Sequence, residues 1–228
     1  MQKLLLLHGA LGSDQSLQPL ASVLENDFEV HTLIFEGHGG KKIPISDFTM
    51  ARFADEVMAY LSQKNIPEIS IFGYSMGGYV GLYLAKHFPE KVTKLYTLAT
   101  KLHWTIEGAA KETAMLNPTI IKEKAPKYAL ALEQLHGDNW EMLMQKTAQM
   151  MLHLGENSTL TTSDFEQITT PIFLSVGDKD VMVTIEETTN AYRKLANAQL
   201  YVMPNTLHPI EKVNVEEVAQ QIKRFMLF

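Results

Sequence analysis

Residues 69–78 read ISIFGYSMGG. The first four of them predict a buried strand, and the residues that follow, 79–87, have the character of a helix. Glycines two positions before and two positions after Ser75 leave room for a sharp turn between the strand and the helix. Such a turn exposes the serine hydroxyl, and the helix N-terminus behind it favours developing negative charge. The pattern makes Ser75 a candidate nucleophile; the alternative is a glycine-rich turn with an incidental serine.

Short apolar runs alternate with helical periodicity along much of the chain. This alternation predicts an α/β fold with a mostly parallel sheet flanked by helices. The near-continuous hydrophobicity of each run fits strands that are covered on both faces. A helix with its apolar residues on one face is expected from residue 50 to 61, with Asp47 as its N-cap, and another near the C-terminus. The expected strands are 3–7, 29–34, 69–74, 92–99, 171–176 and 199–203.

Residues 101–170 interrupt the alternation, because they contain no convincing strand. A block of helices between two strands of a parallel sheet predicts a cap over the carboxyl edge of the sheet, where ligands bind in open α/β folds. We therefore expect a core of residues 1–100 and 171–228 and a helical cap of residues 101–170. The helices expected in the cap are 105–116, 118–124, 127–135 and 140–154.

A serine nucleophile needs a base, and the base needs an acid that orients it. His208 follows the last expected strand, and Asp178 and Asp180 follow the strand before it, so all three belong to the same sheet edge as Ser75. Asp178 directly follows its strand and is expected to cap the turn. Asp180 lies further out and can reach the histidine, so it is the preferred acid and Asp178 the alternative. Structural or surface roles are expected for other histidines, namely His31, His87, His103, His136 and His153.

The loop after the first expected strand reads HGALGS, residues 8–13. When a serine lies on a strand-to-helix turn, a loop of this kind supplies one amide that stabilises an oxyanion, and the residue after the serine supplies the other. The candidate donors are the backbone N–H groups of Ala10 or Leu11 and of Met76. His8 is expected to anchor the loop and to take no part in the chemistry.

Together these motifs resemble the α/β-hydrolase superfamily, specifically the branch with a helical cap between the sixth and seventh core strands. The resemblance covers the whole chain and includes the EGHGG sequence of residues 36–40 and the spacing Gly177-x-x-Asp180. That spacing implies Asp180 as the acid. The first expected strand matches the family's third, which implies that the usual two-strand N-terminal hairpin is missing.

The sequence departs from the family pattern at two places. Leu207 stands where members usually have a glycine before the histidine. Gly40 or Lys41 stands where a serine commonly closes the second glycine-rich loop. Neither departure removes a candidate catalytic group, and both concern the local shape of a loop.

Composition excludes several kinds of chemistry. The chain has 228 residues, no cysteine and a net charge of −6. Disulfides, thiolate metal sites and cysteine nucleophiles are therefore impossible, and the acidic balance argues against nucleic acid as a partner. No histidine pair has metal-ligand spacing, so neither a metal nor a cofactor is expected. The apolar start is too short for a signal peptide or a membrane span, so we expect a cytoplasmic protein. The sequence predicts no particular oligomeric state.

Three functions are compatible with the sequence. The first is hydrolysis of a small-to-medium carboxylic ester or thioester through an acyl-enzyme on Ser75. The second is another reaction on the same fold, either C–C bond hydrolysis or a lyase reaction, because GYSMGG also resembles the elbow of SHCHC synthase. That lyase handles a polyanionic substrate, which favours arginine, and residues 101–170 contain no arginine. The third is non-catalytic binding of a small ligand, against which an intact set of catalytic residues argues.

The character of the substrate pocket is suggested by the expected cap. Trp104, Trp140 and Met144 are expected to line an apolar pocket for the acyl group. The alternative is that tryptophan and methionine at helical spacing pack a core. Further candidates for the lining are Met142, Met150 and Met151.

Overall fold

The computed structural model describes residues 1–228 and contains one six-stranded sheet. The strand order is β2-β1-β3-β4-β5-β6, and every neighbouring pair is parallel. The predicted α/β class is therefore confirmed, with a sheet that is parallel throughout and not only mostly so. Each expected strand is present to within one residue at either end: β1 (Gln2–Leu7), β2 (Phe28–Leu33), β3 (Ile69–Tyr74), β4 (Val92–Leu98), β5 (Ile172–Gly177) and β6 (Ala198–Met203).

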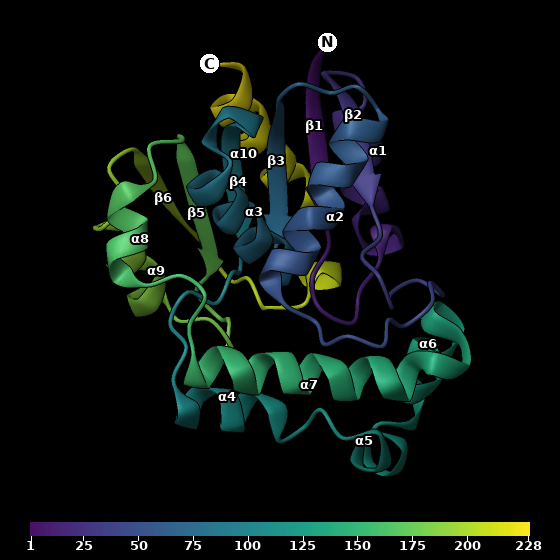
Figure 1. Cartoon of the computed structure of the whole chain (residues 1–228). Coiled ribbons are helices and arrows are strands. Elements are labelled where there is room, and N and C mark those ends of the chain that lie inside the picture. Colours follow the sequence, from purple (N-terminus) through teal and green to yellow (C-terminus); the bar gives the residue numbers. More distant parts are fainter.

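Helices cover both faces of the sheet (Figure 1). Side chains alternate between the two faces along each strand, so a continuously apolar strand has apolar side chains to bury on both. In β1, Leu5 and Leu7 belong to one buried cluster, whereas Leu4 and Leu6 belong to another. The first cluster is covered by α2 (Met50–Gln63), α3 (Met76–His87) and α9 (Ile185–Tyr192). The second cluster is covered by α1 (Gln18–Leu24) and α10 (Val215–Leu227).

The N-cap of α2 is Thr49 and not Asp47, so that prediction is wrong. Thr49 directly precedes the helix with an extended backbone, and its side chain accepts a hydrogen bond from the N–H of Arg52 at 3.2 Å. Asp47 lies too far ahead of the first turn to do this. Its carboxylate is exposed and lies 3.6 Å from Lys146 Nζ.

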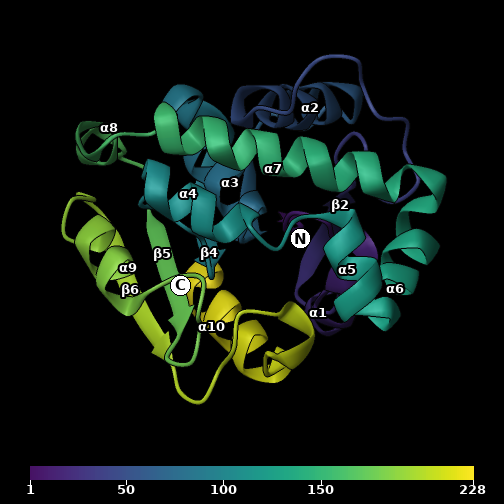
Figure 2. The same cartoon turned by 90° about the horizontal axis from the view of Figure 1, so that it is seen from below.

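Five α-helices and no strand lie between β4 and β5, within residues 101–170, which we call the helical insertion. The helices are α4 (Ile106–Thr113), α5 (Pro118–Lys124), α6 (Pro126–His136), α7 (Trp140–Glu156) and α8 (Thr162–Gln167). α7 runs beneath the carboxyl ends of the strands, and α4 and α5 lie below it (Figure 1). In the view from below, α7 crosses over α3 (Figure 2).

The structure has no membrane-spanning helix, because none of its helices combines the necessary length with the necessary apolar character.

A half-buried carboxyl group on α2 supports the loop that follows β2. Glu56 Oε2 accepts a hydrogen bond from the N–H of Glu36 at 2.9 Å, and its Oε1 is buried without a partner. Burial raises the pKa of Glu56 to about 7, and the nearby carboxylate of Glu36 acts in the same direction. Arg52 engages Glu36 through two hydrogen bonds of 2.8 Å. Glu56 therefore binds a proton in the folded state at a pH where an unfolded chain has lost it.

We expect the stability of the protein to fall with rising pH because of Glu56. The stability that this proton contributes is complete below the ordinary carboxyl pKa. It is lost as pH rises through about 7, the pKa of Glu56 in the folded protein. Glu56→Gln cannot ionise, so its free energy of unfolding should rise relative to wild type between about pH 5 and about pH 8. Urea unfolding of both proteins across this range measures the difference. Glu123→Gln, at an exposed position on α5, should follow wild type, and a pH-independent difference for Glu56→Gln would contradict the assignment.

Candidate active site

Ser75 forms the turn between β3 and α3, with φ 51° and ψ −114°. A side-chain-bearing residue adopts this conformation only under constraint. Here the constraint includes hydrogen bonds on both sides of the residue. Ser75 N–H donates to the carbonyl of Leu98 at 2.8 Å, and Gly78 N–H donates to the carbonyl of Ser75 at 3.0 Å. The turn therefore holds the serine at the carboxyl end of the sheet.

Gly73, Gly77 and Gly78, around Ser75, lie where there is no space for a side chain. A Cβ on Gly73 would lie 2.5 Å from the backbone of Gly77, and a Cβ on Gly77 would lie 2.3 Å from the carbonyl oxygen of Leu7. A Cβ on Gly78 would meet the Thr100 hydroxyl at 2.0 Å. All these separations are shorter than van der Waals contact. The end of β1 consequently packs against the start of α3, backbone to backbone.

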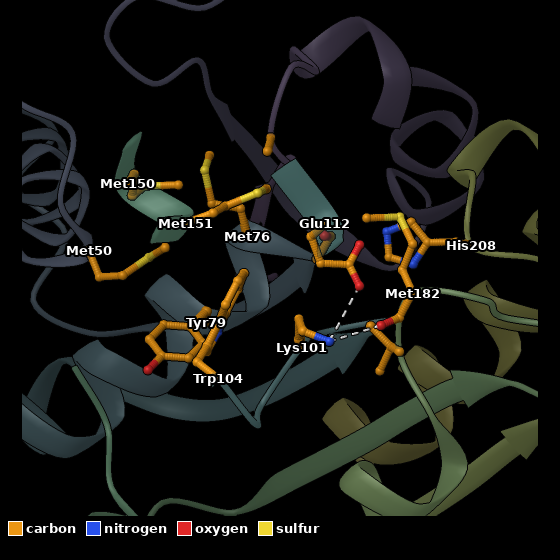
Figure 3. Close-up of a pocket in the computed structure, with 13 residues that line it drawn as sticks. Met50, Met76, Tyr79, Lys101, Trp104, Glu112, Met150, Met151, Met182 and His208 are labelled. Carbon is orange, nitrogen blue, oxygen red and sulfur yellow. Dashed lines mark hydrogen bonds and ion pairs between the residues drawn. The ribbon is translucent and has the colours of Figure 1, made fainter. Parts of the chain in front are cut away.

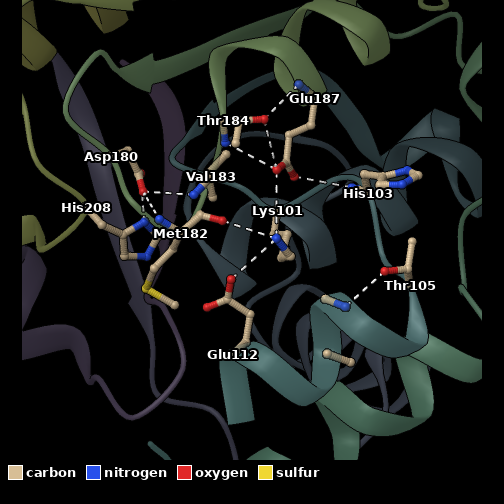
Figure 4. A network of polar contacts seen from close by, with 12 residues as sticks. Lys101, His103, Thr105, Glu112, Asp180, Met182, Val183, Thr184, Glu187 and His208 are labelled. Carbon is tan, nitrogen blue, oxygen red and sulfur yellow. Dashed lines mark hydrogen bonds and ion pairs between the residues drawn. The ribbon is translucent and has the colours of Figure 1, made fainter. Parts of the chain in front are cut away.

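His208 and Asp180 form a hydrogen-bonded pair beside this turn. His208 Nδ1 lies 2.8 Å from Asp180 Oδ2, and the Asp180 side chain is fully buried. Because an ionised carboxylate only accepts, Nδ1 donates and Nε2 is left as the acceptor. Asp180 Oδ1 accepts two more hydrogen bonds, from the N–H groups of Met182 at 2.8 Å and Val183 at 2.9 Å (Figure 4). These contacts fix the carboxylate and, through it, the imidazole.

Asp178, the alternative acid, points to a different partner. Its Oδ1 accepts a hydrogen bond from the N–H of Thr206 at 3.2 Å, and its Oδ2 lies 3.8 Å from Lys179 Nζ. The residue is exposed, and its side chain contacts the loop after β6, whereas the sequence led us to expect a cap on its own turn. The structure therefore brings Asp180, and not Asp178, against His208.

Ser75 and His208 line the same pocket, although their side chains are not hydrogen-bonded to each other. Such contacts are often long in unliganded enzymes and tighten when substrate binds. The loop that carries His208 is fixed by Tyr74, whose hydroxyl donates to the His208 carbonyl at 3.0 Å. Burial raises the pKa of Tyr74, so this hydroxyl stays protonated and remains a donor.

Backbone N–H groups beside Ser75 are available to bind a negative oxygen. Met76 is the first residue of α3, so its N–H has no acceptor within the helix. The N–H groups of Ala10 and Leu11 donate to no protein acceptor. Ala10 and Met76 line the pocket with Ser75, whereas Leu11 does not. Of the two candidates in the first loop, the geometry favours Ala10.

His8 anchors this first loop, as expected from the sequence. Its ring is fully buried, with Nδ1 2.8 Å from the carbonyl oxygen of Gly9 and Nε2 accepting from Phe35 N–H at 3.2 Å. Burial lowers the pKa of His8 to about 4, so the ring is neutral and Nδ1 carries the hydrogen. Because the Gly9–Ala10 peptide is planar, fixing the Gly9 carbonyl also fixes the direction of the Ala10 N–H.

The pocket wall is mainly apolar and rich in methionine. Met50, Met76 and Met150 gather toward one end, and Glu112 and His208 lie toward the other (Figure 3). The enclosed volume is about 40 Å³, small beside the roughly 300 Å³ of many ligand sites. Methionine side chains are flexible enough to rearrange around a larger group. The remaining apolar lining residues are Ala10, Tyr79, Trp104, Met151, Met182 and Val183.

The sequence located only part of this lining. Trp104 lines the pocket, but Trp140 and Met144 do not. Both are buried in a separate cluster inside the helical insertion, so their position does not agree with the expected lining role. Met50 and Met182 line the pocket although no local sequence pattern marks them. Their neighbours in the chain, the start of α2 and the loop bearing Asp180, bring them there.

Two charged side chains also line the pocket. Lys101 Nζ lies 3.6 Å from Glu112 and donates to the Met182 carbonyl at 3.1 Å (Figure 4). It also lies 3.8 Å from Glu187, whose other oxygen accepts the N–H of Leu102 at 3.0 Å. The network connects the start of the helical insertion to the loop of Asp180. The molecule contains no group of three or more histidine, aspartate or glutamate side chains that could hold a metal ion.

Comparison with known proteins places this site in a family. A family model for the alpha/beta hydrolase fold matches residues 3–117, about half of the chain. 3-Oxoadipate enol-lactonase 2 from Acinetobacter baylyi is 29% identical over 97 residues, which cover 42% of this chain and 36% of the lactonase. This chain therefore spans only about a third of that relative in the match.

Two further similarities extend over nearly the entire chain. The pimeloyl-[acyl-carrier protein] methyl ester esterase of Neisseria meningitidis is 24% identical over 246 residues, covering 99% of this chain and 93% of the esterase. The crystal structure of a hydrolase from Pseudomonas aeruginosa superposes with a TM-score of 0.80 at 18% identity, covering 99% of this chain and 89% of that one. The family match, the parallel sheet and the strand-turn-helix serine agree: the chain belongs to the α/β-hydrolase family.

Proposed function

We propose that this enzyme hydrolyses carboxylic esters or thioesters of small-molecule substrates with small-to-medium acyl groups, through an acyl-enzyme on Ser75. The observation that carries the proposal is one pocket that Ser75, His208, Ala10 and Met76 all line. The buried Asp180 behind His208 supports the same assignment. The names of two relatives, an enol-lactonase and a methyl ester esterase, are in keeping with it.

In the first half-reaction, Ser75 Oγ attacks the carbonyl carbon of the ester while His208 Nε2 takes the hydroxyl proton. The electron pair of the carbonyl moves to its oxygen, and the N–H groups of Ala10 and Met76 stabilise the resulting oxyanion. Asp180 stabilises the imidazolium through Nδ1–H. The tetrahedral intermediate then collapses, and His208 donates its proton to the departing alcohol or thiol.

In the second half-reaction, water replaces the leaving group. His208 Nε2 takes a proton from the water as its oxygen attacks the acyl carbon, and the oxyanion forms again at the same N–H groups. Collapse breaks the bond to Ser75 Oγ, and His208 returns the proton to the serine. The products are a carboxylic acid and the free enzyme.

We propose further that the helical insertion, residues 101–170, caps the site over a core of residues 1–100 and 171–228. It contributes Trp104, Met150 and Met151 to the apolar wall and no member of the proposed catalytic set. No arginine lines the pocket, and Lys101 is already paired with Glu112. This wall favours an uncharged acyl group over the polyanionic substrate of a lyase.

The proposal is tested first by covalent labelling and ester turnover. A fluorophosphonate should add once to the wild-type protein and not to Ser75→Ala, as measured by intact mass, because an activated serine attacks tetrahedral electrophiles. Nitrophenyl acetate, butyrate, octanoate and palmitate should be hydrolysed with a preference for the shorter chains. An adduct that survives in Ser75→Ala would place the nucleophile elsewhere. Labelling combined with turnover of diketones but not esters would favour C–C bond hydrolysis.

The assignment of the acid is tested by a matched pair of variants. Asp180→Asn should lower kcat about a hundredfold to ten-thousandfold, because an amide cannot stabilise the imidazolium in the same way. Asp178→Asn should lower kcat by about tenfold at most, since the Asp178 side chain binds the N–H of Thr206 and does not contact His208. Steady-state kinetics on the best nitrophenyl ester measures both. The reverse order of effects would assign the role to Asp178.

The role of the insertion in specificity is tested at Trp104. Trp104→Ala removes a ring from the pocket wall, so kcat/KM should rise for longer acyl chains relative to shorter ones, while labelling of Ser75 persists. Trp140→Ala is the control, because it removes a buried ring from the separate cluster of the insertion. It should cost about 3–5 kcal/mol of stability and leave the chain-length preference unchanged. Equal preferences in wild type and Trp104→Ala would exclude Trp104 from the acyl site.

A further inference from the structure

His136, the last residue of α6, is a buried histidine that the proposed mechanism does not use. Its ring bridges two loops of the core. Nδ1 accepts a hydrogen bond from Gly39 N–H at 2.9 Å, and Nε2 lies 3.0 Å from the carbonyl oxygen of Leu11. A carbonyl oxygen only accepts, so Nε2 carries a hydrogen. Nδ1 accepts and therefore carries none, so the ring is neutral. Burial lowers the pKa of His136 and so favours the same state.

The Leu11 backbone needs such support. Its φ of 56° lies in the left-handed region, which is unfavourable for a residue with a Cβ. The Leu11 side chain also packs against the insertion's own buried cluster, which includes Trp140 and Met144. The helical insertion therefore contacts Leu11 in two ways, through its side chain and through its carbonyl oxygen.

From Leu11, fixed peptide planes lead to the proposed oxyanion donor. The Leu11 carbonyl and the Gly12 N–H belong to one planar peptide, so His136 orients both. Gly12 N–H donates to the carbonyl of Gly9 at 3.1 Å, the same oxygen that His8 contacts. That carbonyl shares its peptide plane with the N–H of Ala10. The Ala10 N–H is thus oriented by two histidines, by His8 through the Gly9 carbonyl and by His136 through Leu11 and Gly12.

We propose that His136 is a positioning residue for the oxyanion-binding N–H of Ala10, acting from the helical insertion through Leu11. The inference rests on the proposed function. His136 does not line the pocket, so it acts only through the loop that it contacts. Its role is to couple the docking of α6 to the geometry of the loop of residues 8–13, where Leu11 lies 125 residues away from His136 in the sequence.

Three substitutions separate positioning from packing. Glutamine places an amide oxygen and an amide nitrogen at a separation similar to that of the two ring nitrogens, so His136→Gln can keep both hydrogen bonds. His136→Leu fills the space but makes neither. His136→Asn is polar but too short to reach both partners. His153→Leu, at an exposed position on α7, is the control within the same insertion.

The expected readout is a change in kcat at nearly constant KM. His136→Leu and His136→Asn should lower kcat about tenfold to a hundredfold, somewhat less than the complete loss of one oxyanion donor. KM should stay within about threefold, because the pocket wall is intact. His136→Gln and His153→Leu should stay within about threefold of wild type. The Ki of a trifluoromethyl ketone, which forms a serine-bound oxyanion, should rise by the same factor as kcat falls.

A merely structural role would give different results. Equal losses in His136→Gln and His136→Leu, or a fall in kcat without weaker binding of the ketone, would overturn the proposal. So would unchanged kcat in His136→Leu. If His136→Leu does not fold, as judged by circular dichroism, His136→Asn and His136→Gln still provide the comparison.

Failure of the proposed function is distinguishable from failure of this inference. A wild-type protein that neither turns over esters nor reacts with the fluorophosphonate would refute the function. Hydrogen exchange in peptides 8–16 and 36–42 then tests the inference without catalysis. Exchange should be faster than wild type in His136→Leu and restored in His136→Gln. Wild-type exchange in His136→Leu would show that the ring does not hold these loops.

Discussion

The candidate active site depends on a close contact between backbones at the carboxyl end of the sheet. Gly77 lies against the carbonyl of Leu7 so tightly that no side chain fits between them. This contact sets the start of α3 beside the end of β1, and the strained turn at Ser75 is one consequence of it. Another is that the loop after β1 begins next to the serine, which gives Ala10 its place in the pocket wall. A parallel sheet then delivers the loops after β5 and β6, with Asp180 and His208, to the same edge.

Burial determines how Asp178 and Asp180, the two aspartates in the loop after β5, differ. Asp180 has no exposed side-chain surface, and its carboxylate is compensated by three directed donors, two from backbone and one from His208. An ion pair in such an environment is screened far less than one in water. Asp178 is exposed to solvent, where its charge would act weakly on an imidazole. The two residues are close in sequence, and it is their environment that distinguishes them.

The inner strands could be predicted because they are covered on both faces and are therefore almost continuously apolar. β3 and β5, with every residue buried, are the clearest examples. The Asn-Pro start predicts α5, which has seven residues, whereas α1, α8 and α9 escaped prediction, since six to eight residues show little periodicity. Their start signals were nevertheless present: Thr161 with Asp164 begins α8, and Thr184 with Glu187 begins α9, each as a capping box. Asp47 and Thr49 are both residue types that cap helices, so residue type alone does not locate the cap of α2.

The pocket wall and the contacts of His136 lay beyond sequence reasoning for a physical reason. Ser75, Asp180 and His208 could be proposed as candidates because each follows an apolar strand at the same sheet edge, and glycines at fixed spacing accompany Ser75 and Asp180. A methionine at the start of α2 is ordinary, and only the packing of α7 across the sheet makes it part of a pocket. His136 binds backbone atoms, an N–H and a carbonyl that every residue but proline possesses, at 97 and 125 positions away. Backbone partners of this kind produce no sequence pattern, so the contacts between the helical insertion and the loop after β1 become visible only in three dimensions.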